Sequence, residues 1–374
     1  MNQPTVVLNM IVKNEGAIIA ETLKHVRPFI DAYAIMDTGS TDNTISEIER
    51  ALDGLPGRVA SMEWNGFADC RNAAIDLAEG LGDYLLFLDA DDKFVITGSV
   101  QQIKSRISKS LHPANILHGP ISYDRVVIRS LKSNSRYHYV IHEVLIDTPE
   151  DSMGERIEGF HIIHNAIGTS DRNNQSDYDK YIRDAQVIER EIEKGAEPQD
   201  LPRYQFYLAQ SYRDSQELEK ALDAYKKRLE MRNGWFQERY VSAVEAGKLY
   251  ARGLGSIGDQ LFAYLQAIEI DATRAEAHFH IAVIARQEQL WKLAFHHARI
   301  ARSLTSPLPS LFSNWEVYAW KATFEVSIVA FYAGAYDEGI SACDELLLHP
   351  DVPESIKKLT VDNKRFYDRS LTAH

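Results

Sequence analysis

Short runs of β-branched residues alternate with amphipathic stretches over the first 90 residues. This pattern is typical of βα units that build a largely parallel sheet. The run at residues 84–88 is apolar on both faces, as a central parallel strand should be. The pattern predicts strands at residues 5–12, 32–36, 58–62 and 83–88, and helices at about residues 16–29, 42–52 and 67–81, the second behind the capping residues Ser40 and Thr41.

The pattern changes between residues 120 and 167, where β-rich segments follow one another without long helices between them. We predict strands at residues 123–131, 137–146 and 157–163. Because the connections are too short for helical crossovers, these strands are expected to extend the sheet in antiparallel fashion.

A polar stretch at residues 169–179 leads into a chain that is almost wholly helical. Ala209 and Ala282 are 73 residues apart, and so are Ala221 and Ala294. That distance is about two periods of the roughly 34-residue tetratricopeptide repeat with a few insertions. We therefore predict two domains, an α/β domain at residues 1–170 and an all-α repeat domain at residues 171–374. The repeats are expected either to present a binding surface or only to support the first domain.

Composition and charge narrow the class of protein. The chain has 374 residues, 45% of them hydrophobic and 25% charged, which is an ordinary globular mixture. Its formal charge of −13 argues against broad contact with nucleic acid or anionic lipid. No apolar run approaches the roughly 20 residues of a membrane helix, so we expect no membrane span and a cytoplasmic protein. The two cysteines, Cys70 and Cys343, do not suggest a disulfide framework.

Three carboxylates crowd together in the segment Asp89-Ala90-Asp91-Asp92, directly after the apolar fourth strand. In an open α/β sheet, ligands bind beyond the carboxyl ends of the strands. Carboxylates packed this closely repel one another unless they share a cation, and a hard divalent ion suits oxygen ligands. The structural alternative is an acidic turn that caps the next helix. A second acidic triplet, Asp177 to Asp179, has no strand before it and is interpreted as solvated surface.

Several further motifs lie in order along the first 170 residues. They are Met10-Ile11-Val12-Lys13-Asn14-Glu15, Asp37-Thr38-Gly39-Ser40-Thr41-Asp42, the F-x-x-x-R-N segment from Phe67 to Asn72, Ile141-His142-Glu143, and the segment from His161 to Gly168. With the acidic cluster, they resemble glycosyltransferase family 2, which has the GT-A (Rossmann-like) fold. The helical half resembles the bacterial branch of that family with C-terminal tetratricopeptide-like repeats.

This resemblance implies a nucleotide-sugar donor and a Mn²⁺ or Mg²⁺ ion. The positions that match the donor-binding motifs are Ile11, Lys13, Glu15, Asp37, Arg71, Asp89 and Ala90, and the implied metal ligands are Asp91, Asp89 and His164. Many members carry an aspartate that recognises uracil where this chain has Thr38. A UDP-sugar is therefore the favoured donor, with the identity of the base left open.

Arg71 suits a diphosphate because its guanidinium offers paired planar donors. The structural alternative is an ion pair on the helix surface with Asp69 or Asp76.

An inverting transfer needs a base that removes the proton of the acceptor, and a carboxylate is a usual choice. Glu143 is the candidate, because it falls in an apolar segment predicted to be a strand, where a charged residue is costly unless it faces a cleft. The alternative is a glutamate at the sheet edge, paired with Arg136 or His138.

For the histidine ligand, His164 is preferred over His161 because it precedes the small-residue turn at residues 165–168. A histidine in a half-buried strand can equally be held by hydrogen bonds alone.

The sequence thus predicts a metal-dependent transfer of a sugar to a hydroxyl or thiol acceptor, which the repeats would present as part of a peptide or protein. A homodimer through the repeat domain is a further expectation. One competing hypothesis is an inactive repeat scaffold that binds a protein partner. Another is a sugar nucleotidyltransferase, which is disfavoured because residues 9–16 lack a glycine-rich basic phosphate loop.

Overall fold

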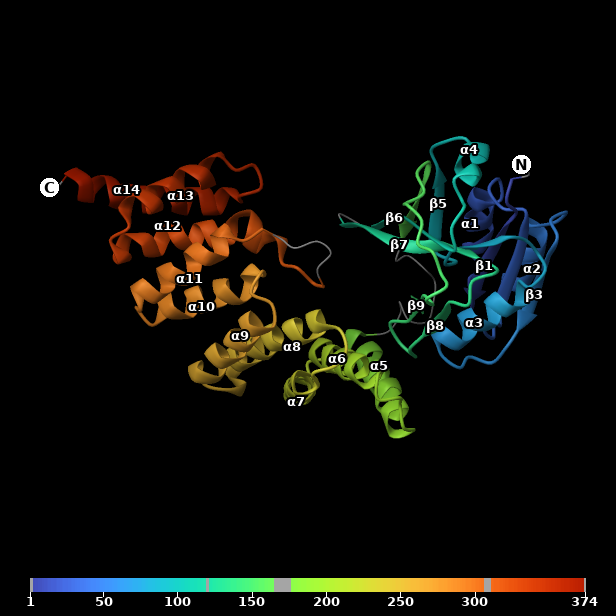
Figure 1. Cartoon of the computed structure of the whole chain (residues 1–374), viewed down its shortest axis with the longest axis horizontal. Coiled ribbons are helices and arrows are strands. Elements are labelled where there is room, and N and C mark those ends of the chain that lie inside the picture. The colour runs from blue at the N-terminus through green and yellow to red at the C-terminus, as the bar shows by residue number, and fades with distance from the viewer. Residues whose placement is uncertain (1–2, 119–120, 165–175, 306–310, 373–374) are drawn as a thin grey trace. The chain divides into compact units, whose positions relative to one another are not determined.

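The computed structural model describes residues 3–118, 121–164, 176–305 and 311–372 (Figure 1). The chain divides into two compact units, Met1–Glu191 and Ile192–His374. The domain boundary predicted at residues 170–171 lies outside the described residues.

Within the described residues, the N-terminal unit contains an eight-stranded sheet with the order β3-β2-β1-β4-β7-β6-β10-β5. The first four strands in this order are mutually parallel and confirm the predicted βα units. Their bounds are β3 Gly57–Ser61, β2 Ala32–Asp37, β1 Val6–Val12 and β4 Tyr84–Phe87. Because these strands are parallel, their carboxyl ends share one edge of the sheet.

Helices cover both faces of this parallel part. Successive residues of β1 alternate between two apolar clusters, with Leu8 in one and Val7 in the other. Helices α1 (Ile19–Val26) and α2 (Thr44–Ala51) contribute to the first cluster, and α3 (Phe67–Leu77) contributes to the second. A strand buried on both faces explains the continuous apolar runs of the sequence.

The side chain that accepts a hydrogen bond from the first amide of α2 belongs to Asp42, not to the predicted capping residues Ser40 and Thr41. The Ser40 hydroxyl instead accepts from the backbone amide of Asn14. The loops after β1 and β2 are therefore fastened to each other at the carboxyl edge of the sheet.

The other half of the sheet is mixed. Strand β7 (Ile121–Ser130) runs antiparallel to β4 and to β6 (Leu111–His118), as predicted for an antiparallel extension. However, β10 (Phe160–His164) lies parallel to β6 and antiparallel to β5 (Asp92–Ile96). Strands β5 and β6 and the short helix α4 (Val100–Ser105) were not predicted.

The prediction of one strand at residues 137–146 is wrong. This segment forms a separate two-stranded hairpin from β8 (Arg136–His138) and β9 (Val144–Ile146). Between the strands, Tyr139 and His142 have φ angles of 77° and 54°, which an extended strand does not allow. The apolar residues of the turn misled the prediction, because Ile141 is buried in the turn itself.

The described part of the C-terminal unit is helical, and consecutive helices pack in pairs as tetratricopeptide-like repeats do. The alanines from which the repeat was predicted, Ala209, Ala221, Ala282 and Ala294, are all fully buried between helices. The pairs are α6 Leu201–Asp214 with α7 Leu218–Glu230, α8 Phe236–Leu249 with α9 Ile257–Ile270, α10 Ala275–Gln287 with α11 Trp291–Ser303, and α12 Ala322–Ala333 with α13 Tyr336–Leu348.

Helix α5 (Asp177–Glu193) precedes these pairs, and α14 (Glu354–Thr372) packs on the last of them. Two short π-helical segments, η1 (Tyr250–Leu254) and η2 (Val317–Lys321), lie beside α8 and α12. Among the described residues, no helix has the combination of length and apolar character that crossing a membrane requires.

The pairing of α8 with α9 depends on the close approach of the two helices at Gly247. A Cβ atom added there would lie 2.6 Å from the ring of the buried Tyr264. We expect Gly247→Ala to lower the free energy of unfolding by about 1–3 kcal/mol through overpacking. The matched change Gly258→Ala, where the nearest atom is a Ser256 oxygen at 3.5 Å, should raise it by up to about 1 kcal/mol. Urea unfolding followed by circular dichroism measures both, and equal effects would contradict the packing argument.

Candidate functional site at the carboxyl edge of the sheet

The acidic cluster lies in a tight turn between β4 and β5. The backbone amide of Asp92 donates to the Asp89 carbonyl, and the Asp89 amide in turn reaches the Asp92 side chain at 3.3 Å. Asp92 is the first residue of β5 and its side chain is fully buried. The turn therefore holds its carboxylates at the sheet edge, where substrates of α/β proteins bind. It does not cap a helix, so the structural alternative for this segment is wrong.

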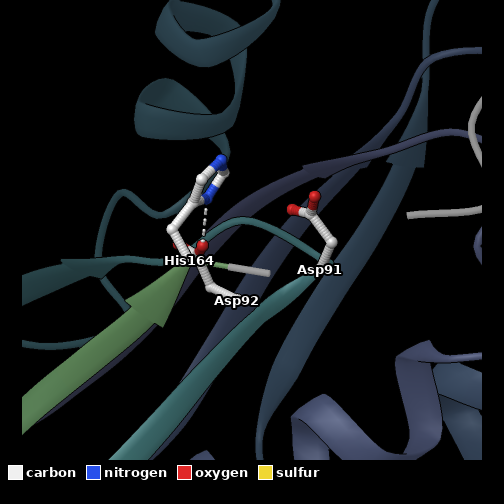
Figure 2. Close-up of side chains that lie close together, drawn as sticks. All are labelled: Asp91, Asp92 and His164. Atoms are coloured by element: carbon white, nitrogen blue, oxygen red, sulfur yellow. Dashed lines mark hydrogen bonds and ion pairs between the residues drawn. The ribbon is translucent and has the colours of Figure 1, made fainter. Parts of the chain in front are cut away.

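Strand register brings a histidine to this turn. The antiparallel pairing of β5 and β10 places His164 directly opposite Asp92. The His164 Nδ1 lies 2.7 Å from an Asp92 carboxylate oxygen (Figure 2). This hydrogen bond, supported by the charges of the three aspartates, outweighs burial and raises the pKa of His164 above its usual value. His161, the alternative, lies three positions away in the same strand and therefore on its opposite face.

Asp91, Asp92 and His164 form a group of possible metal ligands. One ligand atom from each lies within 4.8 Å of the others. The pKa of Asp91 is raised by burial and by the charges of Asp89 and Asp92. Two carboxylates and an imidazole are ligands that accept Mn²⁺ or Mg²⁺, and a cation here would relieve the crowding of charge. The residues present therefore fit a divalent ion.

Asp89 has different partners from those expected of a metal ligand. An Arg71 nitrogen lies 2.7 Å from one of its oxygens, and Arg125 lies 3.6 Å from the other. Burial alone would raise the pKa of the Asp89 carboxyl, but the two guanidinium groups outweigh it and hold the pKa at about 2. In this arrangement Asp89 links the acidic turn to two arginines. The residue that lies beside Asp91 and His164 is Asp92, in the place that was predicted for Asp89.

Arg71 joins the acidic turn to the predicted base. It extends from α3 and contacts Asp89 with one nitrogen and Glu143 with another, the second at 2.9 Å. Its guanidinium also lies over the Tyr137 ring. Its carboxylate partners are therefore not those of the structural alternative, Asp69 and Asp76.

Glu143 lies in the turn of the hairpin and not in a sheet strand. Its side chain is 16% exposed and pairs with Arg71. Arg136, one of the two predicted alternative partners, instead forms an ion pair with Asp76 at 2.7 Å. The other, His138, is exposed in β8.

Asn72 clamps the hairpin to α3. Its side-chain amide donates to the Tyr137 carbonyl at 2.8 Å, and its carbonyl accepts from the Tyr137 amide at 2.9 Å. These two bonds imitate the pairing of a neighbouring β-strand. Within the F-x-x-x-R-N segment, Arg71 thus contacts the charged residues and Asn72 holds the backbone of the hairpin. Sequence reasoning gave Asn72 no role.

Sequence reasoning also missed Arg125. It lies in the middle of β7 and reaches both Asp89 and Asp92. The only signal was a lone arginine between polar and apolar positions of a strand, which is too common to single out.

The other predicted donor-binding residues follow the neighbouring strands at the same edge. Asp37, at the end of β2, accepts hydrogen bonds from the backbone amides of Gly39 and Ser40. Thr38 donates its hydroxyl to the Val12 carbonyl and is buried. At the end of β1 and in the loop after it, Ile11 is half-buried, Lys13 is exposed and Glu15 is buried. The Ala90 carbonyl accepts a hydrogen bond from the Thr22 hydroxyl of α1. Their contacts with a donor stay predictions.

A cleft of about 260 Å³ opens beside the acidic turn. It lies between α1 and residues 91–93, and Ile18, Thr22 and Asp91 are among the residues that line it. Asp91 thus borders an open space, as a residue that binds a ligand must.

The His164–Asp92 pair should make stability depend on pH. Because the folded pKa of His164 is raised, the pair stabilises the protein fully below about pH 6.5, the unfolded pKa. This contribution is lost as pH rises through the higher folded pKa. We therefore expect His164→Asn to cost more stability at pH 6 than at pH 9 in metal-free protein, measured by urea unfolding at both pH values. A cost that does not change with pH would show that the ring is not held as an ion-pair partner.

Loss of the Asn72 clamp should loosen the hairpin. Asn72→Ala leaves the Tyr137 amide and carbonyl without their partners, at a cost of about 1–3 kcal/mol. Amide hydrogen exchange of residues 136–146 should accelerate. The matched control is Asn65→Ala, which removes only an exposed bond to Asp69. Unchanged exchange in Asn72→Ala would rule out the clamp.

The match to a family model covers the part of the chain that carries this site. The sequence model of the family described as Glycosyl transferase family 2 matches residues 8–160, which include most of β1, all of β2 to β9 and the first residue of β10. An uncharacterized glycosyltransferase of Rickettsia felis is 31% identical over 84 residues, 22% of this chain and 28% of its own length. The SPbeta prophage-derived glycosyltransferase SunS of Bacillus subtilis is 23% identical over 238 residues, 60% of this chain and 53% of its own length.

A TPR repeat-containing protein of Synechococcus elongatus is 32% identical over 90 residues, 24% of this chain and 21% of its own length. Among solved structures, the MamA protein covers 46% of this chain and 87% of its own, with 18% identity and a TM-score of 0.35. The TPR protein YrrB covers 48% of this chain and 85% of its own, with 17% identity and a TM-score of 0.37.

The chain spans about half or less of the length of these curated relatives. The family match rests on the domain that carries the acidic turn and the two arginines. This chain therefore contains a domain, at residues 8–160, that matches glycosyltransferase family 2.

Proposed function

We propose that the chain is a metal-dependent glycosyltransferase that moves a sugar from a nucleotide sugar to a hydroxyl or thiol acceptor. The observation that carries this proposal is the group of Asp91, Asp92 and His164 at the carboxyl edge of a parallel sheet. The family of the domain supports a nucleotide-sugar donor. A UDP-sugar is the first candidate, with Thr38 leaving the choice of base to experiment.

The proposed metal ligands are Asp91, Asp92 and His164, with Asp89 held by its arginines instead of by the ion as first expected. A bound Mn²⁺ or Mg²⁺ supplies positive charge to a departing diphosphate. Asp92 fixes the orientation of the His164 ring, and Arg71 offers nitrogen donors near the same edge.

Glu143 is the proposed base. Its carboxylate would take the proton of the acceptor hydroxyl or thiol while the acceptor atom attacks the anomeric carbon. The bond from that carbon to the donor diphosphate breaks, and its electron pair leaves with the nucleoside diphosphate. Attack on the face opposite the leaving group inverts the configuration. Since Arg71 contacts both Glu143 and Asp89, one side chain would connect the acceptor and donor sides of the reaction.

The repeat unit is proposed to bind a peptide or protein acceptor, as the paired helices permit. Self-association through exposed apolar residues of its helices, such as Phe262 and Leu265 of α9, is part of the same proposal. Both depend on surfaces within the unit Ile192–His374.

Metal-dependent donor binding tests this function. We expect UDP-sugars, within a panel of nucleotide sugars, to raise the melting temperature by several degrees when Mn²⁺ is present, because a ligand at 100 times its Kd stabilises a protein by about 2.7 kcal/mol. Asp91→Asn should abolish the shift.

The matched control is Asp177→Asn, which alters the exposed second acidic triplet and should leave the shift unchanged. The proposal would be contradicted if nucleotide sugars stabilised the protein equally without metal. It would also be contradicted if no nucleotide sugar stabilised the protein, and that result would favour an inactive scaffold. If only a nucleoside triphosphate with a sugar phosphate stabilises the protein, a nucleotidyltransferase is favoured instead.

A further inference from the structure

Two arginines approach the acidic turn, and they are held very differently. Arg71 has a side chain that is 13% exposed and makes contacts of 2.7 and 2.9 Å with two carboxylates. The side chain of Arg125 is 37% exposed, and its nitrogens lie 3.6 Å from Asp89 and 3.4 Å from Asp92. Arg71 is therefore a tightly fixed part of the site, while Arg125 is loosely paired and partly exposed to solvent.

Arg125 acts on the same carboxylate as the proposed metal ion. Asp92 accepts from Arg125 through one oxygen and from His164 through the other. Because the Asp92 side chain is fully buried, its charge needs a cation nearby. In the metal-free protein, the guanidinium of Arg125 can supply that charge. A divalent ion at Asp91, Asp92 and His164 would face the positive charge of Arg125 at close range.

An anionic donor changes this balance. Arg125 has five N–H donors, and a planar guanidinium matches the oxygens of a diphosphate. Once an ion neutralises the aspartates, the best partner left for Arg125 is the negative charge that arrives with the donor. Its part-exposed side chain on β7 can change partner without disturbing the buried pairs of Arg71.

We propose that Arg125 is an exchangeable counter-cation, which neutralises Asp89 and Asp92 in the metal-free protein and pairs with the donor diphosphate when the ion and donor are bound. This inference rests on the proposed function and adds a residue that makes binding of the ion and of the donor depend on each other. Such an arrangement disfavours binding of the ion without the donor.

The test separates the two roles of Arg125 by their opposite signs. In Arg125→Gln, Mn²⁺ alone should bind more tightly, on the order of fivefold, because a part-exposed charge of the same sign has been removed. Binding of UDP at saturating Mn²⁺ should weaken by roughly 10- to 100-fold, because charge-assisted hydrogen bonds are lost. Titration calorimetry with Mn²⁺, and with UDP in the presence of Mn²⁺, measures both.

Two further variants complete the test. Arg125→Lys keeps the charge without the planar fork, so Mn²⁺ binding should stay close to that of the unsubstituted protein while UDP binding falls to an intermediate value. The matched control is Arg136→Gln, which removes the same charge from a side chain of similar exposure, 41%, that pairs with Asp76. Neither affinity should change in this control by more than about twofold, since the charge of Arg136 is paired with Asp76 and screened by solvent.

The outcomes are distinct. If Arg125→Gln weakens both Mn²⁺ and UDP binding, or changes neither, the exchange is overturned, and weakening of both would mean that Arg125 only supports the fold. If the unsubstituted protein binds Mn²⁺ but neither UDP nor GDP, the proposed function fails. The Mn²⁺ titrations alone then decide whether Arg125 neutralises the aspartates.

Discussion

Mutual repulsion among carboxylates is the constraint on which the rest of the site depends. A single turn between β4 and β5 holds Asp89, Asp91 and Asp92 in a partly buried place where each charge raises the cost of the others. Basic side chains from three different elements pair with these carboxylates: Arg71 from α3, Arg125 from β7 and His164 from β10. Each of these elements is thereby tied to the same few residues. The sheet positions the acidic turn, and the charge of the turn in turn holds α3, β7 and β10 together at this edge.

The parallel half of the domain could be predicted from the sequence because its strands and helices have distinct periods and its turns contain glycine. The same pattern also predicts where β4 ends and that the acidic residues come directly after it. Strands β5 and β6 could not be predicted, because β5 begins with the same charged residues that suggest a metal-binding loop and β6 contains a proline, Pro113, at a register shift. Both are strands only because long-range partners complete their hydrogen bonds.

The site was predictable to the extent that its residues lie next to recognisable strands. Asp91 and His164 were found in this way, and the structure brings them together. Asn72 and Arg125 were missed because their roles depend on contacts with segments 65 and 33 residues away in the chain. The hairpin was missed because its turn is built from apolar residues, which in sequence look like a strand. Local pattern identifies elements, whereas the partners of a charged side chain are a property of the assembled fold.

The pairing of His164 with Asp92 has a consequence for biosynthesis. The two residues are 72 positions apart, and among the described residues β10 is the last strand of the sheet in chain order. A chain leaving the ribosome therefore makes its acidic turn long before the histidine that completes it. Until then the turn depends on arginines alone, so an incomplete domain lacks one of the three ligands in the proposed metal site. In the proposed function, the chain would therefore become able to bind the ion only after β10 has joined the sheet.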